Sequence, residues 1–130
     1  QKLKIHIEIT YLIIPTLNDD IEEIGRFLNW VEKNLGQDVP LHFSRFHPAH
    51  QMSHLPPTPE EKVIEAVELA IARKFSYVYA GNLFYSDYEN TLCPVCKKVI
   101  IQRSGYQISK ISITKDRKCE FCKTSLPIII

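Results

Sequence analysis

The sequence predicts an α/β protein in which parallel β/α units, residues 1–90, are followed by a small zinc ribbon, residues 91–130. Strand-like and helix-like apolar patterns alternate in the first part, and two C-x2-C pairs lie in the second. The charge also changes sign: residues 1–92 hold 8 Lys and Arg against 13 Asp and Glu (net −5), and residues 93–130 hold 8 against 2 (net +6). This asymmetry favours two units with different surfaces.

The first predicted element is a strand at residues 3–14, where apolar residues first alternate with polar ones and then run continuously. A helix is predicted at residues 21–35, because apolar residues recur there every three or four positions. Capping side chains at residues 18–20 precede it, and Gly36 follows it.

Two further strands are predicted at residues 41–46 and 77–80. Between them, Thr58-Pro59-Glu60-Glu61 looks like a capping box with Pro59 at the first helical position, which predicts the start of a second helix. We expect that helix to bury Val63, Val67, Ala70 and Ile71. Strands and helices that alternate at these lengths are typical of parallel β/α units with right-handed crossovers.

Parallel sheets bind their ligands beyond the carboxyl ends of the strands. We therefore expect any site of the first part near residues 15–18, 45–48 and 81–83. Three strands cannot close a barrel that needs eight, so these units form either a small open sheet or part of a larger barrel.

The second part contains a cysteine pattern typical of a metal site. Two C-x2-C pairs, Cys93 with Cys96 and Cys119 with Cys122, are separated by twenty-two residues that predict a β-hairpin turning near residues 104–105. Four thiolates form the tetrahedral shell that zinc prefers and leave no position open, so we expect a structural Zn²⁺. An iron site, two disulfides and four free thiols are the alternatives.

Four of the five histidines, His42, His47, His50 and His54, are crowded into thirteen residues. They suggest a second metal site, a polar strand-end loop, or hydrogen bonding to a ligand by one or two of them. We expect the fifth, His6, to be a half-exposed strand residue.

The apolar runs are too short to cross a bilayer and the sequence has no secretion-signal pattern, so we expect no membrane association and a cytoplasmic location. The chain begins at Gln1, inside a strand-like pattern, and we expect it to be a piece of a longer protein.

Four phrases, together with the cysteine pairs, carry a resemblance that covers essentially the whole chain. They are residues 8–19 (EITYLIIPTLND), 39–48 (VPLHFSRFHP), 56–59 (PPTP) and 77–82 (YVYAGN). In order and spacing they resemble the C-terminal portion of radical S-adenosylmethionine proteins of the AmmeMemoRadiSam group, relatives of the pyruvate formate-lyase activating enzyme.

The resemblance implies a partial parallel (β/α) barrel. In that family a C-x3-C-x2-C loop holds a [4Fe–4S] cluster, which cleaves S-adenosylmethionine to a 5′-deoxyadenosyl radical. No cysteine precedes Cys93, so this chain lacks the loop. It would supply the last strands and the ribbon of a longer enzyme, and would be inactive without the missing N-terminal part of the barrel.

The resemblance also implies two residues that contact S-adenosylmethionine. His42 stands where the activating enzymes place a cofactor-binding histidine, and Thr10 stands where they have an arginine. We expect no catalytic residue in the chain itself. A protein substrate is an expected partner of the parent enzyme, and self-association is expected of the isolated chain.

An alternative class is a zinc ribbon without catalytic activity that docks a protein or a nucleic acid. The basic charge of residues 93–130, with Tyr106 and Phe121 among the basic residues, motivates it. Four thiolates on one Zn²⁺ remove two of those positive charges, so we expect nucleic-acid binding to be the weaker option.

Overall fold

A computed structural model describes residues 5–83 and 87–128. The chain divides into two compact units, Gln1–Leu83 (unit 1) and Phe84–Ile130 (unit 2). The boundary that we expected between residues 90 and 91 falls inside unit 2. Asn90 accepts a hydrogen bond at 2.9 Å from the N–H of Arg103, and the Glu89 carboxylate accepts one at 3.0 Å from Gly105, so these residues belong to the second fold.

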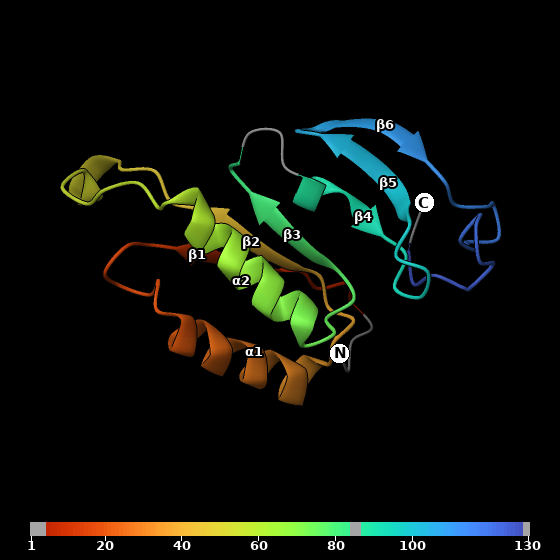
Figure 1. Cartoon of the computed structure of the whole chain (residues 1–130), viewed down its shortest axis with the longest axis horizontal. Helices are drawn as coiled ribbons and strands as arrows, with labels where there is room; N and C mark the ends of the chain where they lie inside the picture. The colour runs from red at the N-terminus through yellow and green to blue at the C-terminus, as the bar shows by residue number, and fades with distance from the viewer. Residues whose placement is uncertain (1–4, 84–86, 129–130) are drawn as a thin grey trace. The chain divides into compact units, whose positions relative to one another are not determined.

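Unit 1 is a parallel sheet of three strands with two helices. Its elements are β1 (Ile9–Ile13), α1 (Ile21–Leu35), β2 (Leu41–Arg45), the short 3-10 helix η1 (His50–Met52), α2 (Glu60–Ala72) and β3 (Val78–Gly81). The strands lie in the order β1-β2-β3 and all pair in parallel, as predicted. Figure 1 shows α1 and α2 side by side over one face of this sheet.

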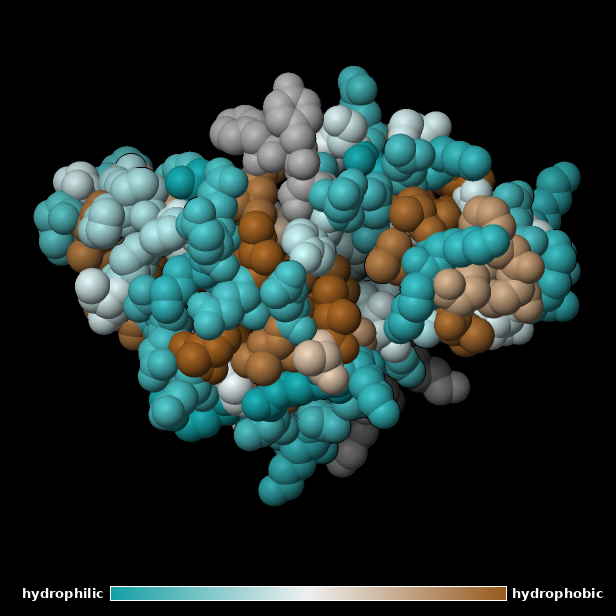
Figure 2. Space-filling view, in the orientation of Figure 1, coloured by the Kyte–Doolittle hydropathy of each residue, from teal (hydrophilic) through white to brown (hydrophobic). Residues whose placement is uncertain are grey.

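The core of unit 1 lies between that face and the helices. Phe43, at the centre of β2, is fully buried, and its ring lies 6.0 Å from that of Tyr11 in β1 and 6.3 Å from that of Phe27 in α1. From α2, Val63, Val67 and Ala70 are fully buried as expected, but the expected burial of Ile71 is wrong, because its side chain is 46% exposed. The outer surface over the helices is a mixture of hydrophilic side chains and smaller apolar patches (Figure 2).

Helix α1 forms where the sequence predicts it, and both of its ends are capped. The Asp20 carboxylate accepts a hydrogen bond at 3.1 Å from the N–H of Glu22. At the other end, Gly36 adopts φ +88°, in the region that glycine accepts without steric cost.

Strand β1 is shorter than the alternating pattern predicted. Of the expected residues 3–14, Leu3 and Lys4 lie outside the described residues, and the strand itself covers Ile9–Ile13. Ile5 and Ile7 precede it with 64% and 37% of their surface exposed. The pairing begins where Ile9 meets Leu41, because the chain turns away just before β2 and offers no partner to earlier residues.

The predicted capping role of Thr58 is wrong. Helix α2 begins at Glu60 with Pro59 as its N-cap, and no side chain caps it. Thr58 is instead fully buried: its hydroxyl donates to the carbonyl of Ile13 at 2.5 Å and accepts from the N–H of Phe46 at 3.1 Å. Leaving buried backbone groups without hydrogen-bond partners costs more folding free energy than leaving a solvated helix end uncapped. The Thr58 hydroxyl therefore bonds to the backbone of Ile13 and Phe46 and not to the helix end.

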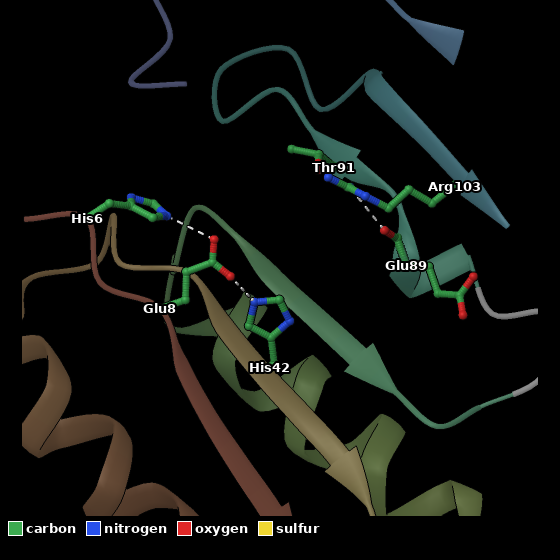
Figure 3. Close-up of polar contacts among 6 residues, drawn as sticks. All are labelled: His6, Glu8, His42, Glu89, Thr91 and Arg103. Atoms are coloured by element: carbon green, nitrogen blue, oxygen red, sulfur yellow. Dashed lines mark hydrogen bonds and ion pairs between the residues drawn. The ribbon is translucent and has the colours of Figure 1, made fainter. Parts of the chain in front are cut away.

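Unit 2 contains a small antiparallel sheet in the order β4-β5-β6. Its elements are the 3-10 helix η2 (Asp87–Glu89), β4 (Thr91–Leu92), β5 (Val99–Ser104) and β6 (Gln107–Ile111). The predicted hairpin is present between β5 and β6, with Gly105 at φ +57°. The Arg103 guanidinium donates to the Thr91 hydroxyl at 2.5 Å and to the carbonyl of Glu89 at 3.4 Å, which ties β5 to β4 and η2 (Figure 3).

In the part of the chain that the structure describes, no helix is both long and apolar enough to cross a membrane.

Candidate metal centre and the open face of the first sheet

The four predicted cysteines converge in unit 2, and their Sγ atoms all lie within 4.8 Å of one another. Cys93 Sγ is 3.6 Å from Cys122 Sγ, and Cys96 Sγ is 3.8 Å from Cys119 Sγ. A disulfide needs about 2.0 Å, so these thiols are not bridged. Four sulfurs placed about 2.3 Å from a central Zn²⁺ would be roughly 3.8 Å apart, so this donor set fits one tetrahedral metal ion.

The two C-x2-C pairs form turns with the same hydrogen bonds. In the first turn the N–H of Cys93 donates to the carbonyl of Lys98, and the N–H of Lys97 donates back to the carbonyl of Cys93. In the second turn, twenty-six residues later, the N–H of Cys119 donates to the carbonyl of Thr124, and the N–H of Lys123 donates to the carbonyl of Cys119. All four N···O distances are 2.9 Å. Lys97 and the equivalent Lys123 adopt φ +59° and +62°, a conformation that costs a non-glycine residue free energy. Because neither position is a glycine, the sequence did not reveal this conformation.

The environments of the four sulfurs are unequal. Burial disfavours the thiolate of Cys119, but backbone N–H groups of Cys122 and Phe121 and the neighbouring thiols outweigh it, so the pKa of Cys119 falls to about 7. For Cys96 the N–H of Lys98 favours the thiolate, yet burial and three neighbouring thiols raise its pKa to about 11. The backbone therefore already stabilises negative charge at one corner of the cluster.

Unit 2 builds its core around these thiols. Cys93 and Cys119 have no exposed surface and pack with Ile100, Ile113 and Leu126. Cys96 is half-buried and Cys122 is exposed, so one side of the site lies in the unit's core and the other near its surface. The two ligand positions in the core indicate a structural role for any bound ion.

The two residues that the resemblance assigned to cofactor binding lie on adjacent strands of unit 1. Thr10 of β1 pairs with His42 of β2, and His42 pairs in turn with Tyr79 of β3. Tyr11 and Phe43, their chain neighbours, point toward the helices, so this row occupies the opposite face of the sheet. The helices of unit 1 leave that face open, and His42 is only partly buried there.

The polar contacts of His42 include a carboxylate that the sequence analysis missed. Glu8 accepts from His42 Nε2 at 2.8 Å and contacts His6 Nε2 at 2.9 Å (Figure 3). The His42 ring also stacks on Tyr79, with ring centroids 4.9 Å apart. Glu8 and Thr10 are two positions apart in the alternating strand pattern, and residues two apart point to the same face of a sheet. The sequence alone could therefore have placed Glu8 on the face of Thr10.

The carboxyl edge of the sheet, where we expected ligands, carries side chains that bind the chain itself. Asn18 accepts from the N–H of Ile14 at 2.6 Å, and Arg45 Nε donates to the carbonyl of Thr58 at 2.6 Å. Asn82 donates to the Ser44 hydroxyl at 3.1 Å. These bonds close the loops over the strand ends.

The second metal site suggested by the histidines finds no support. Within residues 5–83 and 87–128, the four cysteines are the one group of potential ligands close enough to share an ion. His47, His50 and His54 lie exposed in the loop between β2 and α2.

The Glu8 carboxylate leads to a prediction about pH. The hydrogen bond from His6 lowers its pKa below 4.5, burial opposes this, and His42 adds to the lowering. Because the folded pKa is depressed, the contacts stabilise the fold above about pH 4.5 and are lost as the pH falls through the folded value. We expect His42→Ala to move the Glu8 pKa upward in a carboxyl-resolved NMR titration. His47→Ala is the control, and equal shifts in both variants would contradict the contact.

The chain is similar over its whole length to a longer archaeal protein. It is 37% identical over 131 aligned residues to an uncharacterized protein of Methanocaldococcus jannaschii, MJ0808. The chain spans 39% of the length of that relative. No family model matches the chain, and no solved structure matches it.

Proposed function

We propose that Cys93, Cys96, Cys119 and Cys122 hold one structural zinc ion and that unit 2 is a zinc ribbon. The observation that carries this is the convergence of the four sulfurs. Two of their Sγ–Sγ distances, 3.6 and 3.8 Å, match the edge of a tetrahedron around Zn²⁺, and all four atoms lie within 4.8 Å of one another. Two turns with the same backbone hydrogen bonds support it.

The small size of unit 2 also supports a structural ion. Its described core holds three aliphatic residues besides the thiols, and domains of this size usually need a metal or disulfides for stability. A closed shell of four protein ligands leaves no position for a substrate or water, so the ion would contribute folding free energy and no chemistry.

Elemental analysis of the chain purified without added metal tests the identity of the ion. We expect about one zinc per chain, because four thiolates form one complete shell. Stoichiometric iron would contradict zinc, and acid-labile sulfide would indicate a cluster in place of a single ion.

We further propose that unit 1 is the terminal part of a radical S-adenosylmethionine barrel. The observation that carries this is the arrangement of the sheet. Strands β1, β2 and β3 follow one another in order, both helices cover the same face, and the other face carries polar side chains. Successive right-handed β/α units of a barrel have this arrangement, and the face without helices would line the barrel interior.

In that setting His42 and Thr10 would contact S-adenosylmethionine from the interior face. Glu8 would fix the orientation of the His42 imidazole, which can hydrogen-bond a carboxylate or a ribose hydroxyl. The [4Fe–4S] cluster would supply the electron for cleavage, and its cysteines would have to come from another part of the barrel, because residues 1–92 contain no cysteine. The relative is longer than the chain, which spans 39% of its length, so a protein of that length has room for further barrel units.

The test uses the full-length protein encoded by the gene, reconstituted with iron and sulfide without oxygen. We expect its N-terminal part to contain a C-x3-C-x2-C loop and the protein to form 5′-deoxyadenosine from S-adenosylmethionine. His42→Ala should raise KM for S-adenosylmethionine about tenfold, which is the loss of one hydrogen bond to a charged group. His47→Ala, in the exposed loop, should leave KM unchanged. A full-length protein without the cysteine loop would contradict the proposal.

A further inference from the structure

Outside the metal centre, unit 2 has a groove of about 440 Å³ whose described lining includes three lysines and no acidic residue. Lys97 and Lys98 come from the first cysteine turn, Phe121 comes from the second, and Lys110 comes from β6. Val99 adds an aliphatic surface. Since two walls of the groove are the cysteine turns, its shape depends on the structure that holds those turns together.

One contact organises the cationic and apolar parts of the groove. The Lys98 ammonium lies 4.8 Å from the centroid of the Phe121 ring, which is cation–π distance. Phe121 is nevertheless 45% exposed and Val99 is 38% exposed, so apolar surface remains accessible beside the positive charges. A ligand that fits must therefore offer both negative and apolar groups.

The charge of the unit favours a short acidic ligand over a polyanion. Residues 84–130 hold 8 Lys and Arg against 4 Asp and Glu, which gives +4. If the cysteines hold Zn²⁺ as four thiolates, as proposed above, the net charge falls to +2. Three lysines converge on one groove and can pair with two or three negative groups of a short ligand, whereas the small net charge of the unit neutralises few phosphates of a long polyanion.

The side-chain chemistry of the groove points the same way. Single-stranded nucleic acids bind to basic grooves with aromatic rings on which bases stack. The described lining here contains one aromatic ring, Phe121, and no arginine, so successive bases would find no second ring on which to stack. An aliphatic Val99 packs well against a Leu or Ile side chain and offers a base no stacking surface.

We propose that this groove docks a protein segment in which acidic side chains alternate with apolar ones. The carboxylates pair with Lys97, Lys98 and Lys110, and the apolar side chains pack on Val99 and Phe121. The proposed zinc site would hold the two turns that form the groove, but binding of the segment is a separate function. The proposed barrel of unit 1 contributes no residue to the described lining.

Fluorescence anisotropy with the whole chain and a labelled peptide of alternating Glu and Leu tests the proposal. We expect binding that weakens as salt increases and that is absent for the same peptide with Gln in place of Glu. The double variant K98E/K110E should bind at least about tenfold more weakly, because each reversal places like charges together. K33E/K115E changes the net charge equally at exposed lysines outside the groove and should bind normally.

Zinc analysis of each variant separates a failed fold from a failed proposal. If K98E/K110E loses zinc, K110E alone is used, because Lys110 is exposed on β6 and far in sequence from the cysteines. Absence of binding by the Glu peptide, or equal loss in K33E/K115E, would overturn the proposal. Tighter binding of a labelled oligothymidylate that is lost in the groove variant would also overturn it and would identify a nucleic-acid site. None of these binding results would change the zinc content of the chain, which is the separate test of the metal centre.

Discussion

Replacing Cys119 with serine is expected to unfold unit 2 while unit 1 stays folded. Structural Zn²⁺ sites contribute an apparent ~10–16 kcal/mol at neutral pH, and a serine hydroxyl does not replace a thiolate ligand. Cys119 has no exposed surface and packs in the core of unit 2, so the variant loses both a ligand and a core contact. Unit 1 has its own core around Phe43 and contains none of the four cysteines, so we expect it to stay folded.

Hydrogen exchange followed by mass spectrometry measures the two units separately. We expect amide protection to vanish over residues 87–128 and to persist in β1, β2 and β3. Removal of the ion by a strong chelator should have the same effect on the unchanged chain. Glu120→Ser introduces the same residue at the next, exposed position and should keep both zinc and protection. Retained protection of the second unit in Cys119→Ser without zinc would show that the ion is not structural.

The second large effect is expected in unit 1, where Phe43→Ala should lower the free energy of unfolding by about 3–5 kcal/mol. The Phe43 ring is fully buried on the central strand and lies near the rings of Tyr11 and Phe27. Its removal leaves a cavity that the neighbouring rings on β1 and α1 cannot both move to fill. Both described α-helices, α1 and α2, lie in unit 1, so the helical circular dichroism signal in urea reports the unfolding of this unit.

Leu12→Ala provides the comparison on the other face of the same sheet. Leu12 is 41% exposed and points away from the helices, so its removal should cost less than about 1 kcal/mol. If Leu12→Ala were as destabilising as Phe43→Ala, that face would be covered in the isolated chain. Such a result would contradict the open face on which the barrel proposal depends.

Much of the fold follows from local patterns in the sequence. The periodic apolar residues between Asp20 and Gly36 determine α1, because amphipathic spacing and both caps act within the helix itself. The hairpin around Gly105 follows from a turn residue between two apolar runs. The four cysteines were identified because C-x2-C spacing alone brings two thiols to one ion.

Other features were decided by contacts between distant residues, which no local pattern records. Ile5 and Ile7 alternate like strand residues, yet β1 begins at Ile9 because only there does β2 offer a partner. Thr58 has the sequence of a helix cap, but its hydroxyl satisfies two buried backbone groups of β1 and of the segment after β2.

The same division applies to the candidate sites. The sequence by itself determined which cysteines make up the candidate metal centre, since their identity and spacing are local properties. Only the tertiary structure placed Glu8 against His42 and brought Lys98, Lys110 and Phe121 to one groove. The physical reason is that hydrogen bonds and charge clusters depend on which side chains become neighbours across strands and turns. Those neighbours are fixed only when the strands pair and the two cysteine turns come together.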